Sequence, residues 1–223
     1  MTTTFILASQ SPRRHQLMGL LDAHIVTQVS GANEDVVPGQ TPADYVTDVA
    51  RRKAKAVAEL PHPNTTRQAF IIAADTTVAV DGDILGKPAS DAEAYGMLQR
   101  LCDRTHEVHT GLCVIDLASG REISEVQTTH VTMRSYSDAE IQAYIATGDP
   151  LDKAGAYAIQ HTGFHPVIGL DGCYLSVVGL SLCHLISVLI RLNASVSVDM
   201  DALIAAHGGF GCSLLDALQL DPN

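Results

Sequence analysis

The sequence predicts an α/β fold, because short β-branched runs alternate with amphipathic segments along the chain. With 223 residues, of which 46% are hydrophobic, the chain is long enough to bury a sizeable core in one α/β unit or in two small lobes. No internal repeat or linker divides it. The composition changes after Leu192, where residues 193–223 contain a glycine cluster but no Lys or Arg. We therefore expect a domain over residues 1–192 and a C-terminal extension over residues 193–223 that is partly helical.

Capping residues mark the starts of four helices. A Ser or Thr at the N-cap position accepts a hydrogen bond from the first turn, and a Pro fits the first helical position. A Glu three residues after the Ser completes a capping box. These signals place helices after Ser11, Thr41, Ser90 and Ser137, with Glu93 and Glu140 as capping-box partners, an end before Pro61 for the second helix and an end at Gly148 for the fourth.

Strands are expected where short apolar runs are bounded by turn residues. Asp81-Gly82 is a strong signal for a tight hairpin turn. Polar residues interrupt the apolar stretch 173–190, and Gly179 divides it into a strand-like and a helix-like half, so a membrane span is not expected there. The other predicted strands cover residues 5–8, 70–74, 106–117 and 126–134.

The charge balance limits the kinds of partner. Acidic residues outnumber basic ones by 25 to 14, which gives a net charge of -11 and argues against a nucleic acid or an anionic membrane surface. Many of the basic residues fall within residues 1–90, beside turn and helix-start signals. A small phosphorylated substrate fits this distribution better than a long nucleic acid.

The cysteines predict neither a disulfide framework nor a zinc site, because they are odd in number, widely spaced and lack a C-x-x-C pair. The N-terminal apolar run ends at Ala8 and is followed by arginines, which is the wrong order for a signal peptide. Reduced thiols and a cytoplasmic location are expected. The histidines show no metal-binding spacing, and no G-x-S-x-G motif marks a serine nucleophile. The cysteines are Cys102, Cys113, Cys173, Cys183 and Cys212.

Arg13 and Arg14 fall in the first turn of a predicted helix, where the helix dipole disfavours cations. An anion bound at this place would remove the conflict. Free backbone N–H groups, the hydroxyls of Ser9 and Ser11 and two guanidinium groups would together form a phosphate site. The alternative is two solvated arginines on a surface helix.

Lys53 breaks the pattern of the second helix. At the helical period it falls in the middle of an apolar stripe, whereas its basic neighbours project toward the other side. Burying an uncompensated charge is costly, so a lysine that points inward needs a partner. Either Lys53 extends to solvent at the helix margin, or it reaches an interior anionic cleft and serves function rather than stability. The stripe contains Val46, Val49, Ala50, Ala54, Val57 and Ala58.

Asp75 follows an apolar strand, at the place where open α/β sheets bind ligands. A carboxylate there needs a cation, either Lys53 or a metal ion, and the acid would then orient or deprotonate a water molecule. The alternative is an aspartate that caps the following turn. Lys87 does not belong to a P-loop, because Gly82 is one residue too close and Pro88 follows it. It is either a phosphate-binding cation or a surface lysine.

A series of sequence blocks runs in order from Phe5 to about Leu189: ILASQSPRRHQLM, ARRKA, AADTTVAVDGDILGKP, MLQRLCDRTHEVHTG and DKAGAYAIQ followed by VVGLSL. Together they resemble the Maf family of nucleoside triphosphate pyrophosphatases. The resemblance implies an elongated mixed sheet with flanking helices, in two lobes around a central cleft like that of inosine triphosphatases, usually as a homodimer. It also implies hydrolysis of a nucleoside triphosphate between its α and β phosphates with a divalent metal cation, Mg²⁺ or Mn²⁺.

The resemblance also assigns roles to individual residues. Asp75 matches the family's catalytic acid, which accepts a proton, and Lys53 and Lys87 match phosphate-binding lysines. Glu34, in GANED, matches an acidic position associated with the metal, so the predicted metal ligands are Glu34 and Asp75. Arg14 joins the cations expected to neutralise the triphosphate.

Arg13, Thr76 and Gln160 match the positions that mark the subgroup acting on dTTP and UTP. A sister subgroup acts on methylated guanine nucleotides, and a role as a nucleotide-binding regulator of cell division with little turnover is also attached to the family. His161 stands where glycine is usual, so its imidazole is expected to narrow the pocket or stack on the base. Asp103 replaces another glycine, a change that Asp tolerates because it accepts positive φ.

Overall fold

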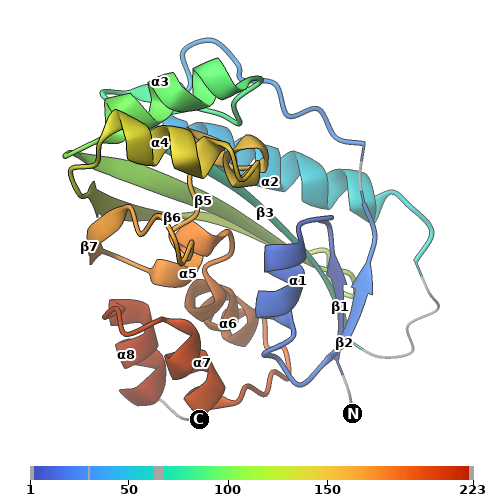
Figure 1. The fold of residues 1–223 in the computed structure, drawn as a ribbon. Coiled ribbons are helices and arrows are strands. Elements are labelled where there is room, and N and C mark those ends of the chain that lie inside the picture. The colour runs from blue at the N-terminus through green and yellow to red at the C-terminus, as the bar shows by residue number, and fades with distance from the viewer. Residues whose placement is uncertain (1–2, 30, 63–67, 221–223) are drawn as a thin grey trace.

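A computed structural model describes residues 3–29, 31–62 and 68–220, and it confirms the predicted α/β class. The strands form a seven-stranded mixed sheet in the order β2-β1-β3-β5-β6-β7, with β4 paired to β3 beside this path (Figure 1). β1 is parallel to β2 and β3, and the remaining pairs are antiparallel. The strands are β1 (Thr4–Leu7), β2 (His24–Thr27), β3 (Ala69–Val80), β4 (Asp83–Leu85), β5 (Thr105–Asp116), β6 (Glu122–Met133) and β7 (Val167–Asp171).

Helices cover both faces of the sheet (Figure 1). Ala50, Ala54 and Val57 of α2 pack on one face against odd-numbered residues of β3, which include Ile71 and Ala73. Helices α1, α5 and α6 pack on the opposite face. The longer helices are α2 (Pro42–Ala58), α3 (Asp91–Leu101), α4 (Asp138–Ile145), α6 (Leu182–Arg191) and α8 (Ser213–Leu220), and the shorter ones are α1 (Pro12–Met18), α5 (Tyr174–Val178), α7 (Met200–Ala206) and the 3-10 turns η1 (Asp149–Asp152) and η2 (Ala154–Ala156).

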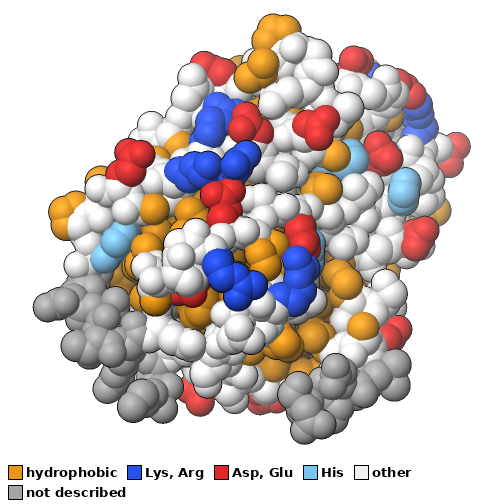
Figure 2. Space-filling view, turned by 180° about the vertical axis from the view of Figure 1, so that it is seen from behind, with side chains coloured by type: hydrophobic (Ala, Val, Ile, Leu, Met, Phe, Trp, Pro, Cys, Tyr) orange, Lys and Arg blue, Asp and Glu red, His pale blue; other side chains and the backbone are white. Residues whose placement is uncertain are grey.

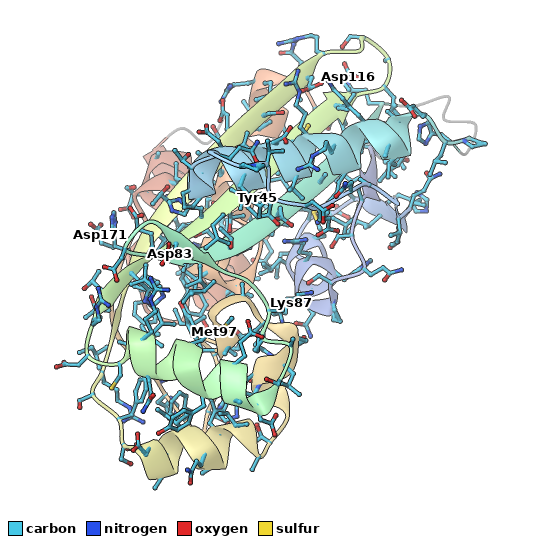
Figure 3. The ribbon with its side chains drawn as sticks, turned by 90° about the horizontal axis from the view of Figure 1, so that it is seen from above. Tyr45, Asp83, Lys87, Met97, Asp116 and Asp171 are labelled. Atoms are coloured by element: carbon cyan, nitrogen blue, oxygen red, sulfur yellow. The ribbon has the colours of Figure 1, made fainter. Side chains whose placement is uncertain are left out.

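The buried core is divided, and this division produces the two lobes. One large cluster joins β1 and the first half of β3 to α1, α5 and α6. A separate cluster joins the second half of β3 and β4 to α3 and α4. Figure 3 shows the resulting elongated outline, with α3 and α4 at one end and α2 toward the other. The expectation of an elongated mixed sheet with flanking helices in two lobes is confirmed.

Local signals explain most element boundaries. Thr41 and Ser137 accept hydrogen bonds from the first turns of α2 and α4, and Ser137 with Glu140 forms the complete capping box. Asp81 and Gly82 have φ of 55° and 83°, as a tight hairpin between β3 and β4 requires. Asp103 also has a positive φ, 57°, as predicted for a residue in place of glycine.

Two capping predictions were only partly correct. Ser11 occupies the N-cap position of α1, but its side chain makes no capping hydrogen bond. Ser90 caps α3 by accepting from Glu93 N, whereas the Glu93 carboxylate accepts from Ala89 N instead of closing the box on Ser90.

The prediction of a strand at the start of residues 173–190 was wrong. This stretch forms α5, a break at Gly179, and α6, and the strand β7 precedes it. Leu175 is buried within the large cluster below the sheet, so packing outweighed the β-branched run at Val177 and Val178. No helix in the described part of the chain has the length and apolar character needed to cross a membrane.

The C-terminal extension is packed onto the domain. Leu203 of α7 and Leu215 of α8 are buried in the same cluster as α5 and α6. Val198 forms an isolated bridge with Leu21, and the Thr3 hydroxyl donates to the carbonyl of Ser195 at 2.7 Å. The described part of residues 193–223 therefore shares its hydrophobic core with the N-terminal lobe.

Candidate active site

A break in the pairing along one edge of β3 forms the floor of the site. On this edge β1 pairs with residues 69–72 and β4 pairs with residues 78–80, while β5 covers the other edge throughout. Among the described residues, no strand pairs with residues 73–77 on that edge. The loop after β1, which contains Ser9, and the loop after β4, which contains Lys87, lie on either side of this gap. The gap opens into a cleft of about 810 Å³ between the two lobes.

Asp75 lies in the middle of β3, and not at the end of a strand as the sequence indicated. The predicted strand end at residue 74 was wrong because β3 continues beyond the end of β1 and pairs with β5 as far as Ala79. Open α/β sheets bind ligands beyond the carboxyl ends of their strands. Here it is the carboxyl end of β1, and not that of β3, that lies at the cleft. The alternative in which Asp75 caps a turn is also wrong, because its carboxylate binds Lys53.

Lys53 reaches the site from α2. Its Nζ lies 2.8 Å from Asp75 Oδ1 and 2.9 Å from Glu34 Oε2. The side chains of Lys53 and Asp75 are 11% and 12% exposed, whereas that of Glu34 is 58% exposed. The sequence interpretation of Lys53 as an inward-pointing lysine with an anionic partner is therefore confirmed, and the alternative of a solvated lysine at the helix margin is wrong.

A glycine allows α2 to lie close enough for this contact. Gly111 of β5 is the registered partner of Asp75. A Cβ atom at residue 111 would overlap with the backbone oxygen of Val46 in α2. The absence of a side chain at Gly111 therefore lets the helix cross directly above the strand pair that carries Asp75.

The other charges of α2 are paired on the surface. Arg51 and Lys55 contact Glu122, and Arg52 contacts Asp48. On the face shown in Figure 2, basic side chains form small groups with acidic ones between them. Arg51, Arg52 and Lys55 are therefore the ordinary surface charges that the helical period predicted.

Arg14 enters the cleft from α1 and has only neutral oxygen partners. Its Nε donates to the carbonyl of Gly179 at 2.8 Å, and its Nη1 and Nη2 donate to the hydroxyls of Ser9 at 3.2 Å and Thr76 at 3.4 Å. Burial lowers the pKa of the Arg14 guanidinium, with Asp75 acting in the opposite direction. Within the described residues no carboxylate forms an ion pair with it, so Arg14 is a cation available to an anionic ligand.

Arg13 does not join Arg14 as predicted, because its guanidinium lies 3.4 Å from Asp152. Asp152 also binds Lys153, whose Nζ is 2.6 Å from Asp152 Oδ1 and 3.0 Å from Asp149 Oδ1. Lys153 is a cleft residue that residue-level reasoning missed. It lies between η1 and η2, where no helical or strand period indicates which way a side chain points.

The remaining predicted residues divide between the wall and the rim of the cleft. Lys87 is exposed and lies between α3 and α1 (Figure 3), and nothing in the described structure forms an ion pair with it. Gln160 is an exposed cleft residue whose amide has no internal hydrogen bond among the described residues. Thr76 faces the side of the sheet opposite to Asp75, and its hydroxyl contacts that of Thr110 at 3.0 Å. The gap in the edge of β3 lets both faces open into one cleft.

His161 does not line the cleft, contrary to the prediction that it would narrow the pocket. Its Nδ1 accepts hydrogen bonds from the backbone of Gly163 at 3.2 Å and Phe164 at 2.9 Å. Its ring also packs against Tyr144, with the centroids 4.6 Å apart. His161 therefore organises the turn behind Gln160.

The acidic residues of the site also affect their surroundings. Burial raises the pKa of Tyr45, and the negative charges of Asp75 and Glu34 raise it further. The Tyr45 hydroxyl donates to the carbonyl of Glu34 at 2.9 Å, which fixes the loop that carries this acid. Carboxylate oxygens are the donors that Mg²⁺ and Mn²⁺ prefer, and here two of them approach one ammonium group. The residues present therefore fit a hard divalent cation held by Glu34 and Asp75.

Comparison with known proteins places the chain in a family. A family model described as Maf-like protein matches residues 4–192. The chain belongs to the Maf-like protein family. It is 46% identical over 181 residues to a dTTP/UTP pyrophosphatase of Salinibacter ruber, a match that covers 81% of this chain and 86% of that protein. It is 40% identical over 202 residues to a protein of the same name from Syntrophotalea carbinolica, covering 91% and 90%. A third relative with this name, from Pelotomaculum thermopropionicum, is 41% identical over 191 residues, covering 86% and 97%.

Proposed function

We propose that this Maf-like protein hydrolyses dTTP and UTP to the nucleoside monophosphate and pyrophosphate. The names of its relatives supply the substrate class. The observation that carries the proposal is the cleft itself. In it the Asp75 carboxylate, paired with the inward-pointing Lys53, lies beside the Arg14 guanidinium, whose partners among the described residues are all neutral. Such a site offers an acid for activating water and cations for a polyanion.

We assign roles to the cleft residues from their charges and from the ion pairs they form. Arg14 and Lys87, which lack anionic partners within the described structure, bind the phosphate oxygens, and Ser9 adds a hydroxyl. Asp75 accepts a proton from the water molecule that attacks the α-phosphorus, and the bond from that phosphorus to the bridging oxygen breaks. Lys53 orients the Asp75 carboxylate and contributes positive charge where negative charge develops.

A divalent cation held by Glu34 and Asp75 would neutralise phosphate charge and act as a Lewis acid. Lys53 binds the same two carboxylates, so with such an ion in place its ammonium group would be free to contact the phosphates. The long, flexible side chain of lysine permits this contact.

Base selectivity is assigned to Gln160, Thr76 and Arg13. The free amide of Gln160 offers a donor and an acceptor to the edge of a pyrimidine. The Thr76 hydroxyl is held by Arg14 and Thr110 at the wall of the cleft. Arg13 reaches a ligand only by leaving Asp152, from which it is 3.4 Å away in the structure.

The test is a panel of purified nucleoside triphosphates, including 7-methyl-GTP, incubated with the protein and Mg²⁺ or Mn²⁺, with every product identified. Monophosphate and pyrophosphate from dTTP and UTP, lost in Asp75→Asn, are the expected result. Orthophosphate and diphosphate would show that a different bond is broken. Preferred cleavage of 7-methyl-GTP would assign the chain to the other subgroup, and binding without turnover would favour the regulatory role.

We also infer that the enzyme acts in the cytoplasm, as its cysteine pattern and N-terminal sequence suggest, and that it forms a homodimer, as the family resemblance implies. Light scattering coupled to size-exclusion chromatography tests the oligomeric state. A monomer at micromolar concentration would contradict it.

A further inference from the structure

Three cysteines and one histidine from distant parts of the chain meet at one point outside the cleft. Cys173 precedes α5, Cys183 lies in α6, His207 follows α7 and Cys212 precedes α8. All four side chains are buried, with exposures between 0% and 3% for the cysteines and 1% for the histidine. Figure 1 shows α7 and α8 beneath α5 and α6, on the side of the sheet away from α2. The cluster therefore lies between the domain and its C-terminal extension.

The ligand atoms are close enough to share one ion. Those of Cys173, His207 and Cys212 all lie within 4.8 Å of one another. Cys183 Sγ is 3.5 Å from His207 Nε2, so a fourth ligand atom lies beside this group. A tetrahedral zinc ion with bonds of about 2.3 Å to sulfur and about 2.0 Å to nitrogen requires a sulfur–nitrogen separation of about 3.6 Å. The Cys183–His207 pair already has this separation, and the Cys173 and Cys212 thiols lie within 4.8 Å of the same histidine.

The histidine is prepared as a ligand by its second nitrogen. His207 Nδ1 lies 2.8 Å from the carbonyl oxygen of Leu203, which can only accept, so Nδ1 carries the proton. The lone pair of Nε2 is then directed at the thiols. Metal-binding histidines donate their other N–H group in this way, which fixes the tautomer and the ring orientation. In addition, the Ser181 hydroxyl contacts Cys173 Sγ at 3.4 Å, as a donor to a thiolate would.

The glycines of the extension serve the same arrangement. Gly208 and Gly209 have φ of 61° and 84° and form the turn between His207 and Cys212. A left-handed backbone at two successive residues suits glycine and reverses the chain within a few residues. Both residues can therefore face the same point.

We propose that Cys173, Cys183, His207 and Cys212 bind one structural zinc ion that fastens the C-terminal extension to the domain. Thiolate and imidazole ligands suit zinc, whereas Mg²⁺ and Mn²⁺ prefer oxygen, so this site is chemically distinct from Glu34 and Asp75. The sequence does not reveal this site, because the four ligands come from four separate places at or in helices α5, α6, α7 and α8 and form no C-x-x-C pair. Gly179, whose carbonyl accepts from Arg14, lies between two of the ligands along the chain. Zinc thereby also stabilises the segment that holds Arg14.

The test begins with metal analysis of the full chain, purified in reducing buffer without chelator. We expect about one zinc ion per chain that survives desalting, and less than about a tenth of that in Cys212→Ser and His207→Ala. Cys113→Ala is the matched control, because Cys113 is a buried thiol in a different cluster, under α2, and this variant should retain the ion.

Cobalt substitution of the wild-type chain gives a second measurement that does not depend on the folding of any variant. Tetrahedral d–d bands and sulfur-to-cobalt charge-transfer absorption are expected, and excess Mg²⁺ should leave them unchanged. Removal of zinc by a chelator should lower Tm, because the ion binds only the folded chain. The proposal is overturned if folded wild-type protein retains neither zinc nor cobalt after desalting, if the cobalt spectrum is octahedral, or if the four residues are found as disulfides. It does not depend on the proposed hydrolysis and is decided without an activity assay.

Discussion

Replacing Lys53 with methionine should both inactivate the enzyme and destabilise its fold. The ammonium group lies 2.8 Å from Asp75, and the two side chains are only 11% and 12% exposed. Removing one partner of a buried ion pair leaves the other charge uncompensated, at a cost of about 3–5 kcal/mol. Water reaches this pair from the cleft, where Glu34 is 58% exposed, so we expect a smaller loss. A loss of about 2 kcal/mol corresponds to a fall in Tm of about 4–8 °C for a chain of this size.

A double-mutant cycle separates the two effects. In Lys53→Met/Asp75→Asn no buried charge is left unpaired, and Glu34, which also loses Lys53, is 58% exposed to water, so much of the lost stability should return. Activity should remain at least about a hundredfold below wild type in both variants. Stability is measured by urea unfolding and scanning calorimetry, and kcat by pyrophosphate release. The sequence alone predicts that Lys53 serves function and not stability. Its contact with Asp75 leads us to expect a contribution to stability as well, whose size depends on whether Asp75 keeps its charge.

Two results would refute this reasoning. If Lys53→Met melts at the wild-type temperature, water already stabilises the Asp75 carboxylate. The loss of Lys53 then carries none of the free-energy cost expected for breaking a buried ion pair. If the folded fraction of Lys53→Met keeps normal kcat, the electrostatic role assigned to the lysine is wrong.

Four further predictions concern other parts of the molecule. Gly111→Ala should displace α2 and lower both activity and stability, the latter by about 1–3 kcal/mol, whereas Gly96→Ala in α3, where a Cβ meets no neighbour, should be neutral or stabilising. The wild-type chain should hydrolyse dTTP and UTP at least about tenfold more efficiently than dATP or GTP by kcat/KM, and Gln160→Leu should reduce this ratio. His161→Gly should leave the ratio unchanged, because its ring faces Tyr144. Burial lowers the pKa of His106 from 6.5 to about 4. The folded chain then binds fewer protons than the unfolded chain between these values, so stability should fall by up to about 3 kcal/mol as pH drops from 6.5 to about 4, and less in His106→Gln.

Residues that break a local rule were the most informative part of the sequence. Lys53 interrupts the apolar stripe of a helix, and the structure brings it to Asp75. Arg14 stands in the first turn of a helix without an acid, and the structure leaves it with neutral partners. Such conflicts are detectable because the helical period and the helix dipole are properties of a few consecutive residues.

Contacts between distant segments could not be predicted in this way. The pairing of Arg13 with Asp152 and the position of Lys153 depend on where two 3-10 turns lie relative to α1. The length of β3 depends on its partner β5, since no residue near Asp75 signals that the strand continues. The meeting of three cysteines with His207 requires the extension to fold back beneath the sheet, and the spacing of the cysteines contains no trace of it.

One structural feature explains how a chain with a net charge of -11 can offer a site to a polyanion. In the described part of the chain no strand pairs with one edge of β3 over residues 73–77, so residues from both faces of the sheet open into the same cleft. On one face Gly111 admits α2, and Lys53 pairs with the carboxylates of Glu34 and Asp75. On the other face Arg14 is held by uncharged oxygens, so its charge is not cancelled. The cleft thus keeps the acids Asp75 and Glu34 and the Arg14 guanidinium on opposite sides of a single strand. The phosphate binding and proton transfer proposed above would then take place a few residues apart, without the two kinds of charge neutralising each other.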